Sequence, residues 1–353
     1  MEKIKILFYS HTIDFAGTWR SHERILLNLD KKLFDPYVFY NPNQDNNRLE
    51  FIIDNLGLDK TIPFQASIDK LGSDKGYPYR ESNFNVIAKS MNFDIIHFAR
   101  SGYYEWPFIE RLSPIQIETN IFGGRDTSSN LDYSVAICNR ISQLRNGSDE
   151  VIYNPIPLPI ENSDTLKEEL NIPDDYFVFG RIGRKAHFYP ISYIVLKKLK
   201  DLGYKFKYII IGACENAMNA IKYFGLQDDC IVVETTNDDF FIHKFYNTID
   251  VFLHYRNDGE CHSTAIAQSL IYGKPVISHF AGYNGQSETI DKGGRVCQNE
   301  QEYLSFLLEL LNNKPFYQQV SELAKKRGLD FEQSKIVSQW ENVYKKLIKK
   351  TSQ

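Results

Sequence analysis

Two long polar side chains flank the start of one expected helix in the segment GECHSTAIAQSLIYGKPVIS, residues 259–278. Glu260 follows a glycine just before that helix, and Gln268 stands eight positions later, within it. The helix is expected to stop at Gly273, and Pro275 leads into a β-branched strand. A carboxylate at such a turn can bind hydroxyl groups and favour developing positive charge, while an amide offers one acceptor and two donors.

Three basic residues lie at and just after an apolar run that predicts a strand over 176–183. They are Arg181, Arg184 and Lys185. At the carboxyl end of a parallel strand they could neutralise a diphosphate without a metal ion, because arginine offers a bidentate fork and lysine a compact charge. A solvated basic loop is the alternative interpretation.

Backbone groups could add to such an anion site. Ser263 and Thr264 open the helix after Glu260, where free N–H groups and a partial positive charge can bind a phosphate oxygen. Gly17, on the loop after the first strand, would let the backbone approach a ligand closely. An ordinary turn explains Gly17 equally well.

The elements that must position these residues alternate between strand and helix. Short apolar runs predict strands at 4–10, 36–42, 93–99, 114–119, 133–138, 150–155, 176–183, 206–212, 230–234, 249–255 and 274–279. Continuous apolar strands separated by helical patterns are typical of parallel sheets covered on both faces. The proline-rich segment 154–164 predicts a linker. We therefore expect an α/β chain with two doubly wound, Rossmann-like domains facing a cleft, followed by C-terminal helices.

The expected boundaries are an N-terminal domain over 1–157 and a second domain over 158–330. The last helix, 331–353, is expected to pack back toward the first domain. Its KKLIKK motif at 345–350 allows weak peripheral contact with a membrane, although a solvated helix face explains the lysines as well.

Composition excludes several classes of protein. With a net charge of -4 over 353 residues, no overall basic field would attract nucleic acid. The five cysteines are scattered without metal-ligand spacing, so we expect reduced thiols, no metal and a cytoplasmic location. The first residues predict a strand rather than a signal peptide, and no apolar run is long enough for a membrane span.

Residues 249–290, IDVFLHYRNDGECHSTAIAQSLIYGKPVISHFAGYNGQSETI, resemble the donor-binding region of retaining glycosyltransferases of the GT-B fold, of the family-4 type. The segments KILFYSHTIDFAGTWRSHERILLNL, VIYNPI and FGRIGRK extend the resemblance. It implies that Arg181 and Lys185 bind a diphosphate, that Glu260 binds the sugar near its reacting carbon, and that Gln268 binds the ribose.

This sequence departs from the family pattern at two places. Gln268 replaces the second glutamate of the E-x7-E motif and loses the strength of a charged hydrogen bond. Asn120 ends a strand where the family often has a histidine near the reacting sugar, so the resemblance makes Asn120 a candidate catalytic residue that could hydrogen-bond a sugar hydroxyl but could not relay a proton. His97, on a neighbouring strand, could substitute as a catalytic group, or it could be a core histidine. His262, beside Glu260, is a further candidate for a sugar contact.

The resemblance implies transfer of a sugar from a nucleoside-diphosphate sugar to a glycan, lipid-linked or other hydroxyl acceptor, with retention and without a cofactor. Three alternatives stay open: a nucleotide-sugar epimerase or phosphorylase of similar architecture, a sugar-binding module without activity, and a degenerate transferase that binds the donor without turnover. An NAD-dependent epimerase would need G-x-G-x-x-G after its first strand, and SHTIDFAG lacks it.

Overall fold

The computed structural model describes residues 2–10, 13, 17–43, 46–64, 83–100, 110–125, 128–144, 147–184, 187–236 and 238–351, and of Arg100 the backbone alone. The chain forms two compact units, which are described separately. Unit 1 comprises 1–155 and 333–353, and unit 2 comprises 156–332. The first boundary follows Pro155, two residues before the expected one, and the second follows Glu332.

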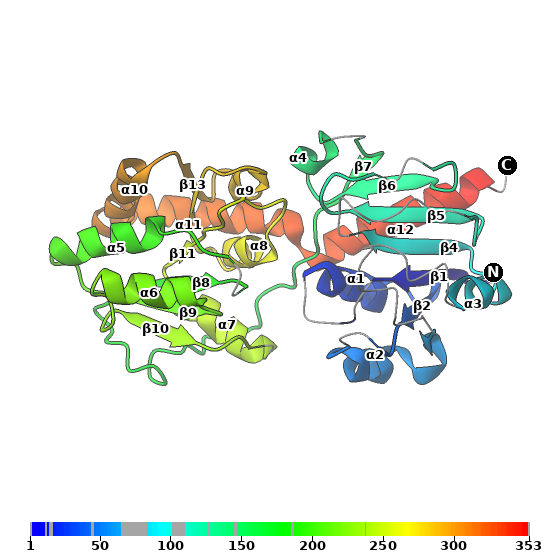
Figure 1. Cartoon of the computed structure of the whole chain (residues 1–353), viewed down its shortest axis with the longest axis horizontal. Coiled ribbons are helices and arrows are strands. Elements are labelled where there is room, and N and C mark those ends of the chain that lie inside the picture. Colours follow the sequence, from blue (N-terminus) through cyan, green and yellow to red (C-terminus); the bar gives the residue numbers. More distant parts are fainter. Residues whose placement is uncertain are drawn as a thin grey trace. The chain divides into compact units, whose positions relative to one another are not determined.

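Unit 1 contains a seven-stranded parallel sheet with the strand order β3-β2-β1-β4-β5-β6-β7 (Figure 1). Its strands are β1 (Ile4–Tyr9), β2 (Phe34–Tyr40), β3 (Thr61–Pro63), β4 (Ile95–Arg100), β5 (Ile115–Asn120), β6 (Tyr133–Ala136) and β7 (Glu150–Val151). Its helices are α1 (Gly17–Asn28), α2 (Leu49–Leu56), η1 (Leu58–Lys60), α3 (Phe84–Ser90), α4 (Asn139–Ser142) and α12 (Gln333–Thr351).

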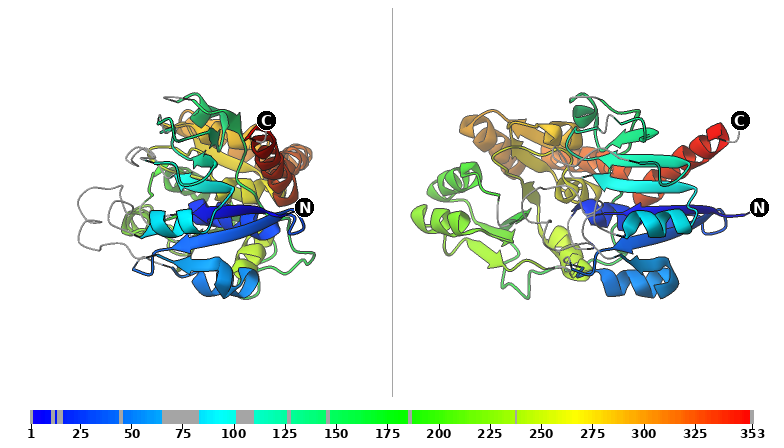
Figure 2. Two further views of the ribbon diagram at one scale, coloured as in Figure 1. Left: turned by 90° about the vertical axis from the view of Figure 1, so that its right-hand side faces the viewer. Right: turned by 45° about the vertical axis from the view of Figure 1, so that its right-hand side comes forward.

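The apolar strands of unit 1 are buried on both faces because successive side chains of a strand point to opposite sides of the sheet. In β1, Ile6 and Phe8 join one core with α1 and α12, whereas Leu7 and Tyr9 join a second core with α3. Figure 2 shows α12 in red alongside this sheet. The 3.6-residue apolar spacing of α12 therefore supplies one wall of the core, with Trp340 almost fully buried.

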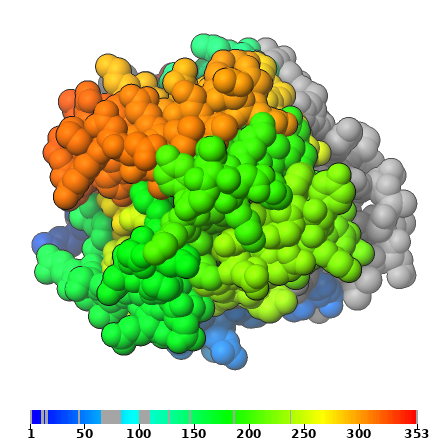
Figure 3. Space-filling view, turned by 90° about the vertical axis from the view of Figure 1, so that its left-hand side faces the viewer, coloured from blue at the N-terminus to red at the C-terminus, as the bar shows by residue number. Residues whose placement is uncertain are grey.

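Unit 2 contains a six-stranded parallel sheet with the order β10-β9-β8-β11-β12-β13. Its strands are β8 (Phe177–Ile182), β9 (Phe206–Ile211), β10 (Cys230–Val233), β11 (Val251–Leu253), β12 (Val276–His279) and β13 (Gly294–Cys297). Its helices are α5 (Ile191–Asp201), α6 (Glu215–Tyr223), α7 (Asp239–Thr248), α8 (Thr264–Ile271), α9 (Gly285–Ile290), α10 (Glu300–Asn312), α11 (Lys314–Gly328) and η3 (Leu329–Phe331). In Figure 3, atoms of α10 and α11 (orange) and of α5 (green) share one face of this unit.

Both sheets have the doubly wound strand order, in which the chain first builds outward on one side of the sheet and then on the other. The predicted Rossmann-like architecture, with its C-terminal helices, is confirmed. Two strands were not predicted, β3 and β13. Each is short and pairs with only one neighbour at a sheet edge, and neither has a continuous apolar run to mark it.

Candidate functional site

The order of the strands in unit 2 fixes where a ligand would bind. β8 and β11 are neighbours, and the chain leaves them toward opposite sides of the sheet. In open α/β sheets the crevice at this switch point, outside the carboxyl ends of the strands, is the usual ligand site. Arg181 lies near the end of β8 and Glu260 lies in the segment between β11 and α8, so both predicted residues belong to this edge.

Arg181 is a buried cation with an unusual set of neighbours. Its side chain is only 2% exposed, and its guanidinium carbon lies 3.8 Å from the centre of the Tyr255 ring. One nitrogen, Nη2, donates a 3.4 Å hydrogen bond to the carbonyl of His187. A Cβ at Gly183 would come within 2.5 Å of the guanidinium, so the glycine leaves the room it occupies.

No carboxylate among the described residues forms an ion pair with Arg181. Burying a charge is costly unless an opposite charge or several hydrogen bonds compensate for it. Tyr255 offers only a cation–π contact, and the 3.4 Å hydrogen bond is long. The position therefore favours an anionic ligand.

The two other basic residues of the predicted anion site give less information. Arg184 is exposed, and its carbonyl accepts a 3.0 Å hydrogen bond from the N–H of His187. Lys185 lies outside the described residues. Their roles in binding a diphosphate stay predictions.

Glu260 is held at both carboxylate oxygens. His254 Nε2 lies 3.5 Å from Oε1, and Arg256 Nη1 donates to Oε2 at 3.1 Å. The side chain is 17% exposed. Burial alone would raise the pKa of Glu260, but the hydrogen bond from His254 and the positive charge of Arg256 outweigh it, so the pKa lies below its usual range. Glu260 is therefore a carboxylate at neutral pH.

The backbone of Glu260 is fixed by the start of α9. The fully buried Gln286 accepts the N–H of Glu260 at 2.9 Å and donates to the carbonyl of His279 at 3.0 Å. The N–H of Gly285 donates to the Glu260 carbonyl at 2.7 Å, and a Cβ at Gly285 would lie 1.8 Å from the Cys261 carbonyl oxygen. The loops after β11 and β12 are thus joined backbone to backbone.

The N-terminus of α8 follows directly. Ser263 is its N-cap, and its hydroxyl accepts the N–H of Ile266 at 3.4 Å. Thr264 is the first residue of the helix and is half-buried. Because the Ser263 hydroxyl already caps the helix, its share in anion binding would come from the backbone N–H groups beside it.

Gln268 lies on the same helix and is half-buried. Its side-chain amide has no hydrogen-bond partner among the described residues. It keeps its full capacity to bind two hydroxyl groups, which is compatible with the predicted ribose role.

His262 corrects one of the sequence-based expectations. Its ring is buried, lies edge-on to Phe331 and contacts the hydroxyl of Thr289 through Nδ1 at 3.1 Å. Burial lowers its pKa to about 4. His262 thus packs into the interior of unit 2, so we no longer assign it a sugar contact.

His187, which the sequence did not single out, connects the two parts of the site. Burial lowers its pKa, and its ring also responds to the charges of Arg256, Glu260 and Arg181. One half-buried imidazole therefore lies within electrostatic reach of both the basic strand end and the acidic turn. Arg181 lies over the ring of Tyr255, and the adjacent residue His254 contacts Glu260, so Arg181 and Glu260 belong to one neighbourhood of unit 2.

His97, in unit 1, occupies the core. It is fully buried; Nδ1 contacts the Tyr344 hydroxyl at 2.9 Å and Nε2 the Thr119 hydroxyl at 2.8 Å. Burial and the neighbouring His22 lower its pKa well below the usual value. Since both nitrogens are already bonded to buried hydroxyls, we replace the predicted catalytic role of His97 with a structural one.

The two other candidates of unit 1 lie at element ends. Asn120 ends β5 and is 2% exposed. Its Oδ1 accepts the N–H of Gly123 at 2.8 Å, while Nδ2 has no partner among the described residues. Gly17 is the first residue of α1. The predicted roles of Asn120 in catalysis and Gly17 in diphosphate binding stay predictions.

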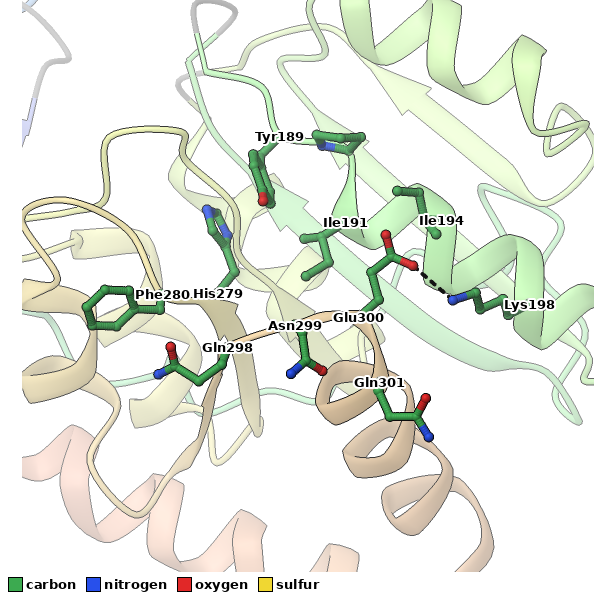
Figure 4. A pocket seen from close by; sticks show the side chains of 11 residues that line it. Tyr189, Ile191, Ile194, Lys198, His279, Phe280, Gln298, Asn299, Glu300 and Gln301 are labelled. Atoms are coloured by element: carbon green, nitrogen blue, oxygen red, sulfur yellow. Dashed lines mark hydrogen bonds and ion pairs between the residues drawn. The ribbon is translucent and has the colours of Figure 1, made fainter.

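A separate pocket of about 540 Å³ opens beside the carboxyl ends of β12 and β13 (Figure 4). Tyr189 stacks on His279 at one end, with ring centres 4.1 Å apart, and Phe280 lies beside them. Lys198 and Glu300 form an ion pair of 2.9 Å at the other end. The pocket contains none of the residues predicted from the sequence, but the His279 carbonyl accepts a hydrogen bond from Gln286, whose amide oxygen accepts the N–H of Glu260.

Across the described ranges, no group of three or more histidine, cysteine or acidic residues has an arrangement that could hold a metal ion. The described helices include none with the length and apolarity needed to cross a membrane.

Comparisons with protein-family models and with curated proteins find no match for this chain. Its fold is nevertheless similar to that of solved glycosyltransferases over almost its whole length. A glycosyltransferase from Rickettsia africae aligns with a TM-score of 0.74 and 16% identity, covering 99% of this chain and 100% of that one. HepE from Anabaena, in complex with UDP and glucose, aligns with a TM-score of 0.72 and 14% identity over 97% and 99%. Sucrose-phosphate synthase from Thermosynechococcus elongatus aligns at 0.70 and 13%, over 98% and 99%.

These similarities confirm the predicted GT-B fold, the two-domain Rossmann-like architecture of such glycosyltransferases. At identities of 13 to 16% they establish the fold alone.

Proposed function

We propose that this protein is a glycosyltransferase that moves a sugar from a nucleoside-diphosphate sugar to a hydroxyl acceptor, with retention and without a metal ion. The observation that carries the proposal is Arg181, a buried guanidinium that has no anionic partner among the described residues and lies at the switch point of the unit 2 sheet. The fold adds support, because HepE, which has the same architecture, was solved with UDP and with UDP-glucose.

Each end of the donor has a proposed partner in this chain. Arg181 would bind the diphosphate, assisted by the N-terminus of α8. Gln268 would bind the ribose and Glu260 the sugar. Further diphosphate contacts are proposed for Arg184, Lys185, Gly17, Ser263 and Thr264.

The proposed chemistry breaks the bond between the anomeric carbon and the diphosphate oxygen and forms a bond from that carbon to the acceptor oxygen. The bonding electrons leave with the diphosphate, and the proton of the acceptor hydroxyl passes to the departing diphosphate oxygen. Arg181 would stabilise the charge that develops on the leaving group, where a low-dielectric site strengthens the interaction. The Glu260 carboxylate would favour the positive charge that develops on the sugar.

Arg181→Met tests the anion site, because methionine keeps an apolar stem and removes the charge. A hydrogen bond to a charged group contributes about 1.5 to 3 kcal/mol, so UDP binding should weaken roughly 10- to 150-fold. The melting temperature without ligand should change little, since the variant also removes an uncompensated buried charge. Arg295→Met is the matched control: Arg295 is an exposed arginine of unit 2 that lies over Phe306, and its loss should leave UDP binding unchanged.

The activity itself is tested with a panel of UDP-, GDP- and ADP-sugars in the presence of a chelator. A donor at a hundred times its Kd should stabilise the protein by about 2.7 kcal/mol, and slow release of free sugar should follow. If no nucleotide sugar shifts the melting temperature or loses its sugar, the proposed function is wrong. If activity appears only after a divalent metal is added, its metal-independent form is wrong.

A further inference from the structure

We propose that His254 is a positioning residue for Glu260, which holds the carboxylate in one orientation through a hydrogen-bonded chain that begins at Ser278. The proposal deepens the proposed function and rests on it for its kinetic consequences. Its structural part, the effect of His254 on the Glu260 carboxylate, can be measured in the protein without substrate.

The geometry places His254 between a rigid strand and the carboxylate. His254 follows β11 directly and is 5% exposed. Its Nδ1 lies 2.8 Å from the hydroxyl of Ser278, a fully buried residue of the adjacent strand β12. Its Nε2 lies 3.5 Å from Oε1 of Glu260. The chain Ser278–His254–Glu260 thus connects the sheet to the turn.

The direction of each proton follows from what the partners can do. An ionised carboxylate only accepts hydrogen bonds, so Nε2 of His254 must carry the proton that points to Glu260. In the neutral ring Nδ1 is then an acceptor, and the Ser278 hydroxyl donates to it. Ser278 also lies 3.5 Å from the His279 carbonyl, but the 2.8 Å contact is the better bond for its single proton.

His254 and Arg256 act on different oxygens of Glu260. Arg256 holds Oε2 at 3.1 Å, yet it also donates to Asp258 at 2.6 and 2.9 Å through Nε and Nη2. Arg256 is therefore shared between two carboxylates on a turn, whereas His254 is anchored to the sheet. Gln286 holds the backbone N–H of Glu260 and Arg256 holds Oε2, so the 3.5 Å contact of His254 with Oε1 orients the other carboxylate oxygen.

The residue type at this position also calls for an explanation. β11 consists of three fully buried apolar residues, and His254 continues that strand into the site. A buried imidazole is costly unless its nitrogens find partners, and here both partners lead to Glu260 or to the strand beside it. A side chain that served packing alone would need neither hydrogen bond.

The charged groups around His254 and Glu260 determine how the pKa of Glu260 should change when His254 is replaced. Glu260 faces His254 and Arg256, and His187 acts on it from the segment after β8. Asp258 forms an ion pair with Arg256, and burial and the electrostatic effect of His254 lower the pKa of His279 on β12. Removal of His254 takes away a hydrogen bond that favours the charged carboxylate, while these other groups remain. The pKa of Glu260 should then rise.

His254→Phe, His254→Gln and the control His243→Phe form the test set. His243 is a buried histidine of the same unit, with contacts to Tyr272 and Asn162 through its two nitrogens. In His254→Phe, carboxyl-carbon NMR of the ligand-free protein should show a higher Glu260 pKa. With donor and acceptor, kcat should fall on the order of tenfold to a hundredfold, as expected for a misplaced catalytic group. KM for the donor should change little, since Arg181 would hold the diphosphate.

His254→Gln keeps an N–H that can reach the carboxylate, so it should recover part of both the pKa and kcat. His243→Phe should leave the Glu260 pKa at its wild-type value. If His254→Phe does not fold, Ser278→Ala removes only the anchor of the chain and should give a smaller change in the same direction.

An unchanged Glu260 pKa in both His254→Phe and Ser278→Ala would overturn the proposal, as would equal kcat values for His254→Phe and wild type. A wild-type protein that turns over no donor refutes the proposed function instead. The NMR titration still decides the role of His254 in that case.

Discussion

Gln286→Met is the substitution that most directly tests how the loops of the candidate site are held. Methionine has a similar length and is unbranched, so it can fill the buried space of Gln286 without its amide. The change removes two hydrogen bonds, one from the Glu260 N–H at 2.9 Å and one to the His279 carbonyl at 3.0 Å. Both lost partners are backbone groups of the loops that carry the site.

The magnitude follows from counting the groups left without a partner. Each buried polar group that loses its hydrogen bond costs about 1 to 3 kcal/mol, so two such groups cost about 2 to 6 kcal/mol. For a unit of this size, 1 kcal/mol corresponds to a melting-temperature shift of about 2 to 4 °C. The transition of unit 2 should therefore fall by about 4 °C or more.

Differential scanning calorimetry measures the shift, and hydrogen exchange at the Glu260 amide reports whether the loop itself opens. The control is Gln301→Met, which changes an exposed glutamine of α10 whose side chain has no hydrogen bond to other described residues. A Gln286→Met transition within about 1 °C of wild type, with the Glu260 amide still protected, would refute the reasoning.

Three further predictions concern Glu260 of unit 2 and Tyr344 of unit 1. Glu260→Ala should abolish sugar transfer without loss of the folded state, and unchanged activity would contradict its assigned role. The pKa of Glu260 in the folded protein lies below the ordinary 4.5, so its carboxylate should stay charged at neutral pH. The contribution of this carboxylate to sugar transfer should be lost only as the pH falls through that lowered pKa. A pH–rate profile in which Glu260 causes a loss of activity well above pH 4.5 would contradict this. Tyr344→Phe leaves His97 Nδ1 without its 2.9 Å partner in the core of unit 1 and should cost about 1 to 3 kcal/mol, measured by the shift of the unit 1 transition; no shift would show that the pair contributes nothing.

Some residues of the candidate site could be predicted from the sequence, and others are recognised only in the structure, because their contacts arise in different ways. Arg181 and Glu260 were found from the sequence because each stands at a strand end, and a parallel sheet gathers such ends at one edge. Gln286 and Glu260 are 26 residues apart in the sequence, and their hydrogen bond depends on the conformations of two loops. No local sequence pattern predicts that contact. His254 was visible only as a histidine near the turn, since its bond to Ser278 depends on strand pairing.

Two histidines that the sequence suggested as site residues show the same limit of sequence-based prediction. His97 was expected on a strand next to that of Asn120, and His262 stands two residues after Glu260, yet both rings are buried. His97 is bonded to Tyr344, a residue of α12 that lies 247 positions away in the chain. Whether a strand residue faces a cleft or a covering helix depends on which helix covers that face, and this helix comes from the end of the sequence.

By itself, the sequence determined the alternation of buried strands and amphipathic helices, the two-domain division near the proline-rich linker, and the placement of a basic and an acidic residue at strand ends. These follow from local periodicity, which hydrophobic burial imposes on every strand and helix. Only the tertiary structure decided which polar side chains are bonded inside the core and which retain unused capacity, as Arg181 and Gln268 do. That distinction depends on contacts between segments far apart in the chain, which no local pattern of residues encodes.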